Sequence, residues 1–387
     1  MFAGREDELE ILHKALFQTT NGNATHFLIH GERGIGKSSL LMVIDGLATG
    51  ELTYKETKYS FLTVNVELEP GDNYADIIQK VARELHRELE RNQPVKALLK
   101  DVWSFVTSWE VMGVKYKREN TPIDAMLEEL ADKFIAIASK LTQPGQGIYL
   151  FIDEADKPNA DAGLGEFVKV FTERLSKRST GNVGVGVIGI STVIEKMRKS
   201  HESSVRILTP LQLAQLKPDD RKDVVRKGLA QANEKNANAV SITEDALDLI
   251  SGLSEGYPHF IQQYAYCAFE VDSDDQIDGG DVGRALVGDK GALQLLGERF
   301  FENMYTDEIR SDAYRTVLQV AARHFPEYVS RKAIITESGL RRHTVNNAIA
   351  ALKKRGSLQA RKGSSGQFRL PSRSFATWIL AFKVAHS

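Results

Sequence analysis

Cysteine is almost absent from this 387-residue sequence, which contains only Cys267. A single thiol forms no internal disulfide and supplies no cysteine-rich metal site, so both kinds of scaffold are excluded. Long hydrophobic runs are missing too. Apolar stretches such as residues 148–152 and 183–190 are far shorter than the ~20 residues that a membrane-spanning helix requires.

The first residues lack the order of a signal peptide. They read Met-Phe-Ala-Gly-Arg-Glu-Asp-Glu, which is acidic where a signal peptide is basic and then apolar. The lone cysteine suits a reducing compartment. We therefore expect a cytoplasmic protein with no membrane partner.

Charge is nearly balanced overall but uneven along the chain. The formal net charge is −2, with 42% hydrophobic and 26% charged residues, as in an ordinary globular protein. From residue 310 onward there are 15 Lys/Arg against 3 Asp/Glu, while the rest holds 35 against 49. A basic block attached to an acidic body predicts a polyanionic partner for that block.

Strand-like and helix-like segments alternate over the first half of the chain. The strand-like segments are residues 25–30, 61–67, 148–152 and 183–190, and the helix-like ones between them include residues 37–48 and 74–90. This alternation predicts an α/β fold with a mainly parallel sheet covered by helices. Residues 94–118 interrupt it, and we expect a helix and a small hairpin there.

Three domains are predicted. Residues 1–210 form the α/β core, residues 211–305 an all-helical lid and residues 306–387 a basic C-terminal domain. Within the lid, Pro218 should begin a helix, and Ser241-Ile-Thr-Glu244 has the pattern of a capping box that opens the next one.

The segment Gly31-Glu-Arg-Gly-Ile-Gly-Lys-Ser38 matches G-x-x-x-x-G-K-[ST] without deviation, between an apolar strand and a helix. Glycines let backbone N–H groups surround phosphate oxygens, and the helix N-terminus favours negative charge. Lys37 should contact the β- and γ-phosphates, and Ser38 should coordinate Mg²⁺. The expected ATP contacts are Gly31, Gly34, Ile35, Gly36, Lys37, Ser38 and Ser39. The alternative is an ordinary glycine-rich turn.

A second acidic element completes the predicted site. Residues 148–154 read Ile-Tyr-Leu-Phe-Ile-Asp-Glu, an apolar strand that delivers two carboxylates at its C-terminal end. Asp153 should hold the Mg²⁺ ion through its water shell, and Glu154 should orient the attacking water.

Two further residues are weaker candidates. Ser191 follows the strand at 183–190, where its hydroxyl would reach the γ-phosphate or the water; the alternative is a helix N-cap. Arg206 precedes a last core strand at Ile207-Leu208 and would act on a neighbouring subunit's ATP, which implies a homo-oligomer. The alternative is a surface or interface arginine.

Together these residues resemble the AAA+ ATPases, in particular the initiator-like and STAND-like prokaryotic branch. The resemblance implies a P-loop core, a helical lid and a C-terminal winged helix over nearly the whole chain. Gly31–Ser38 and Asp153-Glu154 look like its Walker A and B motifs, and Ser191 and Arg206 lie near its sensor 1 and trans-acting arginine. Phe2-Ala-Gly-Arg5-Glu6 looks like a segment near the adenine, which implies a base-side contact from Arg5.

The lid departs from the initiator pattern. Where an arginine is usual in initiators, this chain has Gly256-Tyr-Pro258-His259-Phe260. A Gly-x-Pro here is similar to STAND-type ATPases and implies nucleotide contacts from Pro258 and His259, with ATP acting as a slow switch. The alternative for His259 is a helix-start histidine with no ligand.

The basic block has the order of a winged helix-turn-helix. Residues 311–324, 330–338 and 341–355 are predicted helices, with Ser330 as a cap, and a hairpin follows with its tip at residues 361–366. Val345, Ile349 and Leu352 form the buried stripe of the third helix. The opposite side of this helix and the hairpin tip carry basic and polar residues, so we expect them to contact duplex DNA. The expected contacts are Arg341, Arg342, His343, Thr344, Asn346, Asn347, Arg361 and Lys362. The alternative is a winged helix for protein contact.

Two functions follow from these features. The first is an ATPase that binds DNA and uses its nucleotide state to control assembly and recruitment of a protein partner. The second is a STAND-type signalling ATPase whose winged helix contacts protein.

Overall fold

The computed structural model describes residues 3–91, 123–178, 180–236, 238–288, 290–302, 305, 311–361 and 363–384. The insertion predicted at residues 94–118 and the candidate Lys362 lie outside these ranges. The chain divides into two compact units. One comprises Arg5–Ala214, and the other begins at Gln215 and includes Gly4.

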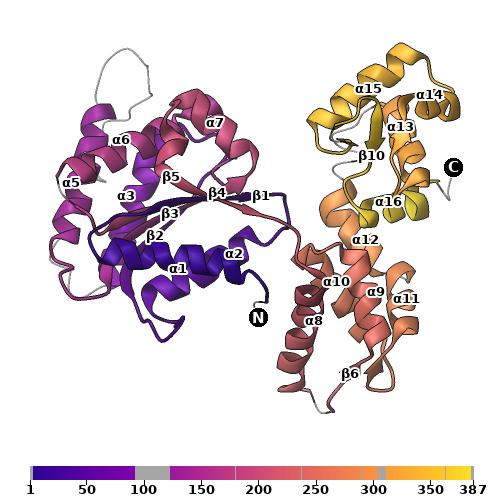
Figure 1. Cartoon of the computed structure of the whole chain (residues 1–387), viewed down its shortest axis with the longest axis horizontal. Coiled ribbons are helices and arrows are strands. Elements are labelled where there is room, and N and C mark those ends of the chain that lie inside the picture. The colour runs from indigo at the N-terminus through magenta and orange to yellow at the C-terminus, as the bar shows by residue number, and fades with distance from the viewer. Residues whose placement is uncertain are drawn as a thin grey trace. The chain divides into compact units, whose positions relative to one another are not determined.

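A five-stranded parallel sheet forms the centre of the N-terminal unit (Figure 1). Its strands are β1 (His26–Gly31), β2 (Ser60–Glu67), β3 (Gln146–Asp153), β4 (Val183–Ile190) and β5 (Leu208–Leu213), in the spatial order β2-β3-β4-β1-β5. The predicted α/β fold is confirmed. Because the strands are parallel, the residues that follow β1, β3 and β4 lie along the same edge, and β4 separates the other two.

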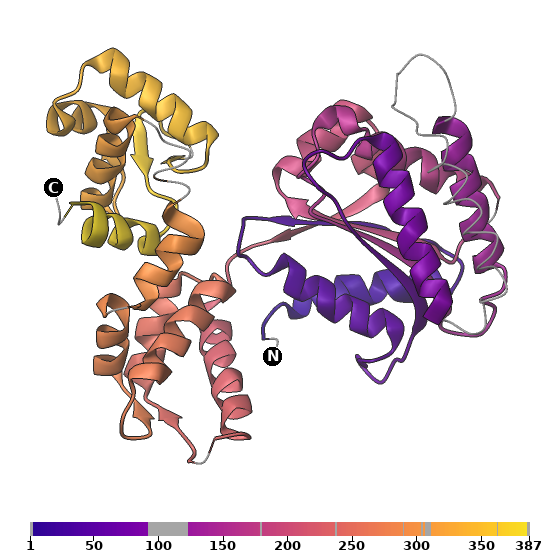
Figure 2. The same ribbon diagram turned by 180° about the vertical axis from the view of Figure 1, so that it is seen from behind.

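Helices cover both faces of this sheet (Figures 1 and 2). The helices α1 (Glu6–Thr20) and α2 (Lys37–Thr49) lie on one face. The other face carries α3 (Tyr74–Arg91), α5 (Ile123–Ala138), α6 (Leu164–Lys177) and α7 (Thr192–Ser200), followed by the 3₁₀ turn η3 (Ser204–Ile207). Burial on both faces explains why the central strands β3 and β4 are almost continuously apolar.

Alternating glycines in β4 make room for aromatic rings. A Cβ on Gly184 would lie 2.4 Å from the ring of Tyr149, and one on Gly186 would lie 2.6 Å from Phe27. The ring of Tyr149 stacks on Phe151 with 5.1 Å between centroids. The pattern Val-Gly-Val-Gly-Val therefore presents its valines to one face of the sheet and leaves the other face to these rings.

Where the structure describes it, the lid is helical apart from one pair of two-residue strands. Its elements are α8 (Pro218–Asn233), β6 (Ser241–Ile242), α9 (Glu244–Ser254), α10 (Pro258–Val271), β7 (Gln276–Ile277), α11 (Gly279–Val287), α12 (Ala292–Leu296) and the π-helical turn η4 (Gly297–Phe301). The capping box predicted at Ser241 is wrong. Ser241 belongs to β6, which pairs with β7, and the N-cap of α9 is Thr243. A capping box does occur in α11, between Asp278 and Asp281.

The C-terminal elements have the winged-helix order. They are α13 (Asp312–His324), β8 (Val329–Ser330), α14 (Arg331–Ser338), α15 (Arg342–Lys354), β9 (Gln359–Ala360), β10 (Gln367–Arg369), α16 (Arg373–Ile379) and the turn η6 (Leu380–Val384). Ser330 caps α14 as predicted, because its Oγ accepts the Ala333 N–H at 3.1 Å. Val345, Ile349 and Leu352 are buried as predicted.

The helix α16 packs directly against the lid. The Ser374 hydroxyl donates to the Leu253 carbonyl at 3.1 Å and lies 2.6 Å from the Tyr264 hydroxyl. The backbone N–H of Arg373 donates to the Glu255 carboxylate. Lid and winged helix accordingly belong to one compact unit, while the predicted boundary at residues 305 and 306 stays a prediction.

None of the helices in the described part of the chain is both long and apolar enough to span a bilayer.

The substitution Gly297→Ala is expected to lower the free energy of unfolding of the C-terminal unit by about 1–3 kcal/mol. The new Cβ would lie 2.0 Å from Nε1 of Trp378, so α16 would have to shift. Urea unfolding followed by tryptophan fluorescence measures the change. Gly283→Ala is the control: its Cβ meets nothing within 4 Å in α11, and it should raise the stability by up to about 1 kcal/mol. Equal stability of the two variants would contradict close packing at Gly297.

Candidate functional site

The loop between β1 and α2 has the backbone that phosphate binding requires. Gly34 and Gly36 have φ angles of 77° and 95°, a left-handed backbone that favours glycine and suits a loop whose N–H groups surround an anion. Ile35 between them is buried and anchors the loop. Ser38 and Ser39, in the first turn of α2, are exposed.

Arg5 holds this loop from the side. Its Nη2 donates to the Ile35 carbonyl at 3.0 Å, and its Nη1 donates to Glu8 at 3.0 Å. Arg5 has a φ of 68° just before α1, and its side chain is buried. The structure thus places Arg5 against the phosphate loop, and its contact with the base stays a prediction.

The ammonium group of Lys37 lies over the loop. It donates to the Glu32 carbonyl at 2.9 Å. Burial lowers its pKa, and the carboxylates of Asp156, Glu154 and Asp153 lie near enough to oppose that shift. The strand order therefore brings the predicted phosphate-binding lysine and the predicted acidic pair together.

Asp153 and Glu154 differ in their surroundings. Burial raises the pKa of Asp153, although its Oδ1 accepts the Glu154 N–H at 2.7 Å. Glu154 has a φ of 52°, a strained backbone for a residue with a side chain, and its side chain is 42% exposed. The turn thus separates a half-buried carboxylate, suited to a metal, from one that faces solvent.

An ion-pair network that sequence reasoning missed surrounds Glu154. The Lys157 ammonium lies 3.1 Å from Glu67 Oε1 and 3.9 Å from Glu154 Oε2. Glu67 ends β2, whose register places it beside Asp153. Lysine three residues after a glutamate is a common surface pattern, so only the sheet register identifies this network.

Ser191 does not cap α7 with its side chain. Its hydroxyl lies 3.3 Å from Nδ1 of His30, a buried residue at the end of β1 that the sequence analysis did not single out. Burial lowers the pKa of His30, which keeps its ring neutral near pH 7. Asp156, also missed, fixes the adjoining strand end by accepting the Ile190 N–H at 2.7 Å.

These residues fit a nucleotide with Mg²⁺ better than a metal alone. Among the described residues, no group of three or more His, Cys, Asp and Glu side chains is arranged to hold a metal ion. Mg²⁺ is commonly bound by one or two protein oxygens together with substrate phosphates. Ser38 and Asp153 are the residues that would hold it.

The remaining ATP-site candidates belong to two different units of the chain. Arg206 is exposed in η3, within the N-terminal unit, and lines a surface hollow that also includes Arg198 and Glu202. Pro258 and His259 begin α10 in the C-terminal unit. The His259 ring lies 4.7 Å from the Phe300 ring, and its buried Nε2 has no hydrogen-bond partner within the described part of the chain.

The DNA-contact candidates lie together at the start of α15. Arg341 is its N-cap, and Arg342, His343, Asn346 and Asn347 are exposed. Thr344 is half-buried. Arg361 is exposed directly after β9, where its Nη1 donates to Gln367 Oε1 at 2.9 Å.

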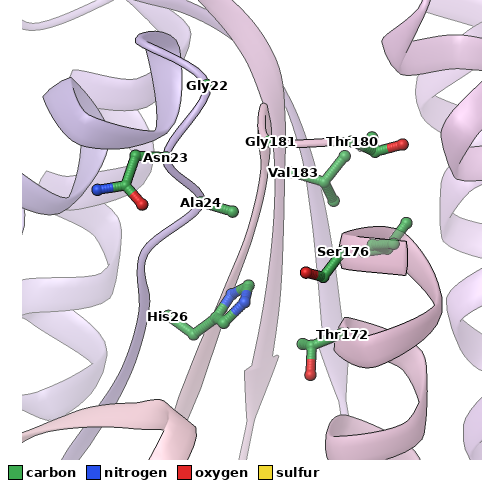
Figure 3. Close-up of a pocket in the computed structure, with 10 residues that line it drawn as sticks. Gly22, Asn23, Ala24, His26, Thr172, Ser176, Thr180, Gly181 and Val183 are labelled. Carbon is green, nitrogen blue, oxygen red and sulfur yellow. The ribbon is translucent and has the colours of Figure 1, made fainter. Parts of the chain in front are cut away.

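A separate polar hollow of about 350 Å³ lies where β1 and β4 begin, at the opposite edge of the sheet (Figure 3). Burial lowers the pKa of His26 to about 4, so its ring is neutral at pH 7. Nδ1 accepts the Val185 N–H, which leaves the proton on Nε2. None of the ten residues that line this hollow is a lysine or arginine, so the triphosphate site is assigned to the other edge.

Comparison with known proteins agrees with this geometry. Residues 1–185 match the family model of the AAA ATPase domain. No curated protein matches the chain at a significant level.

Solved structures extend the likeness beyond the AAA ATPase domain. The Aeropyrum pernix ORC2 protein in ADPNP–ADP complexes matches 99% of this chain and 94% of that one, with a TM-score of 0.57 and 14% identity. The ADP form of the same protein matches 100% and 93%, with a TM-score of 0.52 and 15% identity. The shared property is the fold, an AAA+ core followed by a lid and a winged helix.

Glu154→Gln is expected to keep ATP binding and to slow hydrolysis by at least ~10²-fold, because an amide cannot take a proton from water. Phosphate release and nucleotide titration measure the two effects. Glu67→Gln removes a charge from the same Lys157 network and should hydrolyse ATP at close to the original rate. Lys37→Ala should lose tight ATP binding. Undiminished hydrolysis by Glu154→Gln would contradict the assignment.

Proposed function

We propose that the protein binds and hydrolyses ATP, binds duplex DNA through its winged helix, and uses the nucleotide state to control its assembly and the recruitment of a protein partner. One observation carries the proposal. The same chain contains a sheet edge at which Lys37, Asp153 and Glu154 lie together, and a basic winged helix. The likeness in fold to ORC2 structures that contain ADPNP and ADP supports the nucleotide part.

In the proposed reaction, the residues at the sheet edge have separate roles. Bound ATP and Mg²⁺ supply the phosphoanhydride bond and a cation that neutralises phosphate charge. Lys37 and the loop N–H groups would bind phosphate oxygens, and Ser38 and Asp153 would hold the metal. Glu154 orients water and accepts its proton, while Ser191, fixed by His30, offers a hydroxyl beside the reacting groups. Catalysis then consists mainly of positioning and charge stabilisation.

The DNA part rests on charge and exposure. The block from residue 310 onward carries 15 Lys/Arg and 3 Asp/Glu. Four of its exposed polar side chains lie in the first half of α15, the end that a recognition helix presents to base edges. Arginine and asparagine are the residues that make bidentate contacts to guanine and adenine.

The second candidate function is a STAND-type switch whose winged helix binds protein. It is favoured by the Gly-x-Pro segment of the lid, where Gly256 has a φ of 86° and lies against the backbone of Leu216. This position tolerates no side chain, and Pro258 and His259 follow it closely. A gel shift with and without ATP separates the two functions, since only the first predicts a DNA complex.

Arg206→Ala is expected to reduce ATP turnover on the order of 10³-fold in the assembled protein, by the scale of arginine fingers, and to leave dilute monomer unaffected. ATPase rates measured across a range of protein concentrations test this. Arg198→Ala, an exposed arginine of the same hollow, is the matched control and should change neither rate. An equal loss in monomer would refute the action in trans.

The full chain should bind duplex DNA with a steep dependence on salt. If about five phosphates are neutralised, affinity should fall about 10²–10³-fold between 50 and 200 mM salt. Fluorescence anisotropy with a labelled duplex measures this. Arg342→Ala should weaken binding. Lys383→Ala should not, because Lys383 is paired with Glu302 at 3.0 Å. Binding that ignores salt, or none at low salt, would count against the proposal.

A further inference from the structure

The three-stranded sheet of the winged helix has one buried face and one polar face. In β10, Phe368 lies opposite Val329 and both are buried. Side chains alternate along a strand, so Gln367 and Arg369 project to the other side. Tyr328 directly precedes β8, and its ring lies against the guanidinium group of Arg369.

On this polar face, two guanidinium groups contact one aromatic ring. The guanidinium carbon of Arg369 lies 4.9 Å from the centroid of Tyr328, and that of Arg361 lies 5.5 Å from it. Arg361 is held a second time, because its Nη1 donates to Gln367 Oε1 at 2.9 Å. Its backbone N–H also donates to the Gln367 carbonyl at 3.0 Å.

The two arginines differ in their surroundings. Glu255 of the lid lies near Arg369: burial raises the pKa of this glutamate, and the charges of Arg373 and Arg369 oppose the shift. Arg361 is exposed, and in the described part of the chain it has no carboxylate within ion-pair distance. Residues 357–370 contain no Asp or Glu at all. Arg361 is thus the more exposed of the two cations, and its charge is available to an anion.

We infer that the polar face of this sheet binds the DNA phosphate backbone, with Arg361 as the phosphate ligand and with Tyr328 and Gln367 as the residues that position it. This inference rests on the proposed DNA binding and goes beyond it in assigning Tyr328 and Gln367. The chemistry is general: a guanidinium stacked on a ring keeps its N–H groups directed outward, and ordering it before binding reduces the entropy lost on contact.

The test compares three variants of the full chain on a labelled duplex. Tyr328→Leu, which keeps bulk and removes the ring's attraction for cations, should weaken binding about three- to tenfold. It should also lower the slope of log affinity against log salt by about one, as expected for the loss of one phosphate contact. Tyr328→Phe keeps the ring and should bind like the original protein. Gln367→Ala should also weaken DNA binding and reduce its salt dependence, but by less than Tyr328→Leu.

A thermodynamic cycle distinguishes positioning from a general structural role. If Tyr328 acts through Arg361, then Tyr328→Leu should cost less than about twofold in a chain that already carries Arg361→Ala. The inference is overturned if Tyr328→Leu lowers DNA affinity just as much in the Arg361→Ala background, or if Tyr328→Leu alone leaves the salt dependence unchanged. Thermal melting of each variant verifies folding, and Gln367→Ala supplies the same test if Tyr328→Leu does not fold. If the unaltered protein binds no DNA, the proposed function itself fails.

Discussion

Electrostatic attraction across one edge of the parallel sheet is the interaction on which the N-terminal unit depends. The Lys37 ammonium lies on the loop that follows β1, and the opposing carboxylates follow β3, two positions away in the sheet. The strand between them, β4, ends at Ile190, and Ser191 follows it directly at the same edge of the sheet. Parallel strands place all these chain ends together, and this permits charges from distant parts of the sequence to act on one ligand.

Around this edge, the fold restrains each charged group by a separate contact. Arg5 fixes the loop through the Ile35 carbonyl, Asp156 fixes the end of β4, and Lys157 lies between Glu67 and Glu154. The strained backbone at Glu154 turns its side chain to solvent while Asp153 stays half-buried. Such restraint suits a site that stabilises charge by fixed geometry, because little reorganisation is then needed when a polyanion binds.

Much of this was predictable from local sequence. The strand at 183–190 has the predicted bounds, because its valines and glycines contrast with the polar residues that flank it. The phosphate loop and the Ser330 cap follow from residue types at fixed spacing. The strand order, the His30–Ser191 contact and the Lys157 network were not predictable, since each depends on which strands are neighbours. The pair of two-residue strands β6 and β7 is too short for any periodic pattern, and this is why the lid appeared entirely helical.

The seam between the lid and α16 decides where the chain can be divided. Ser374, Phe375 and Trp378 are buried, and the rings of Phe375 and Trp378 contact Phe301 of the lid at centroid distances of 5.2 and 5.9 Å. A fragment that began at residue 306 would leave these rings in water and would remove the Glu255 carboxylate, which accepts the backbone N–H of Arg373. The natural place for a cut is instead between Ala214 and Gln215, so the smallest fragment that keeps the winged helix folded has to retain the lid.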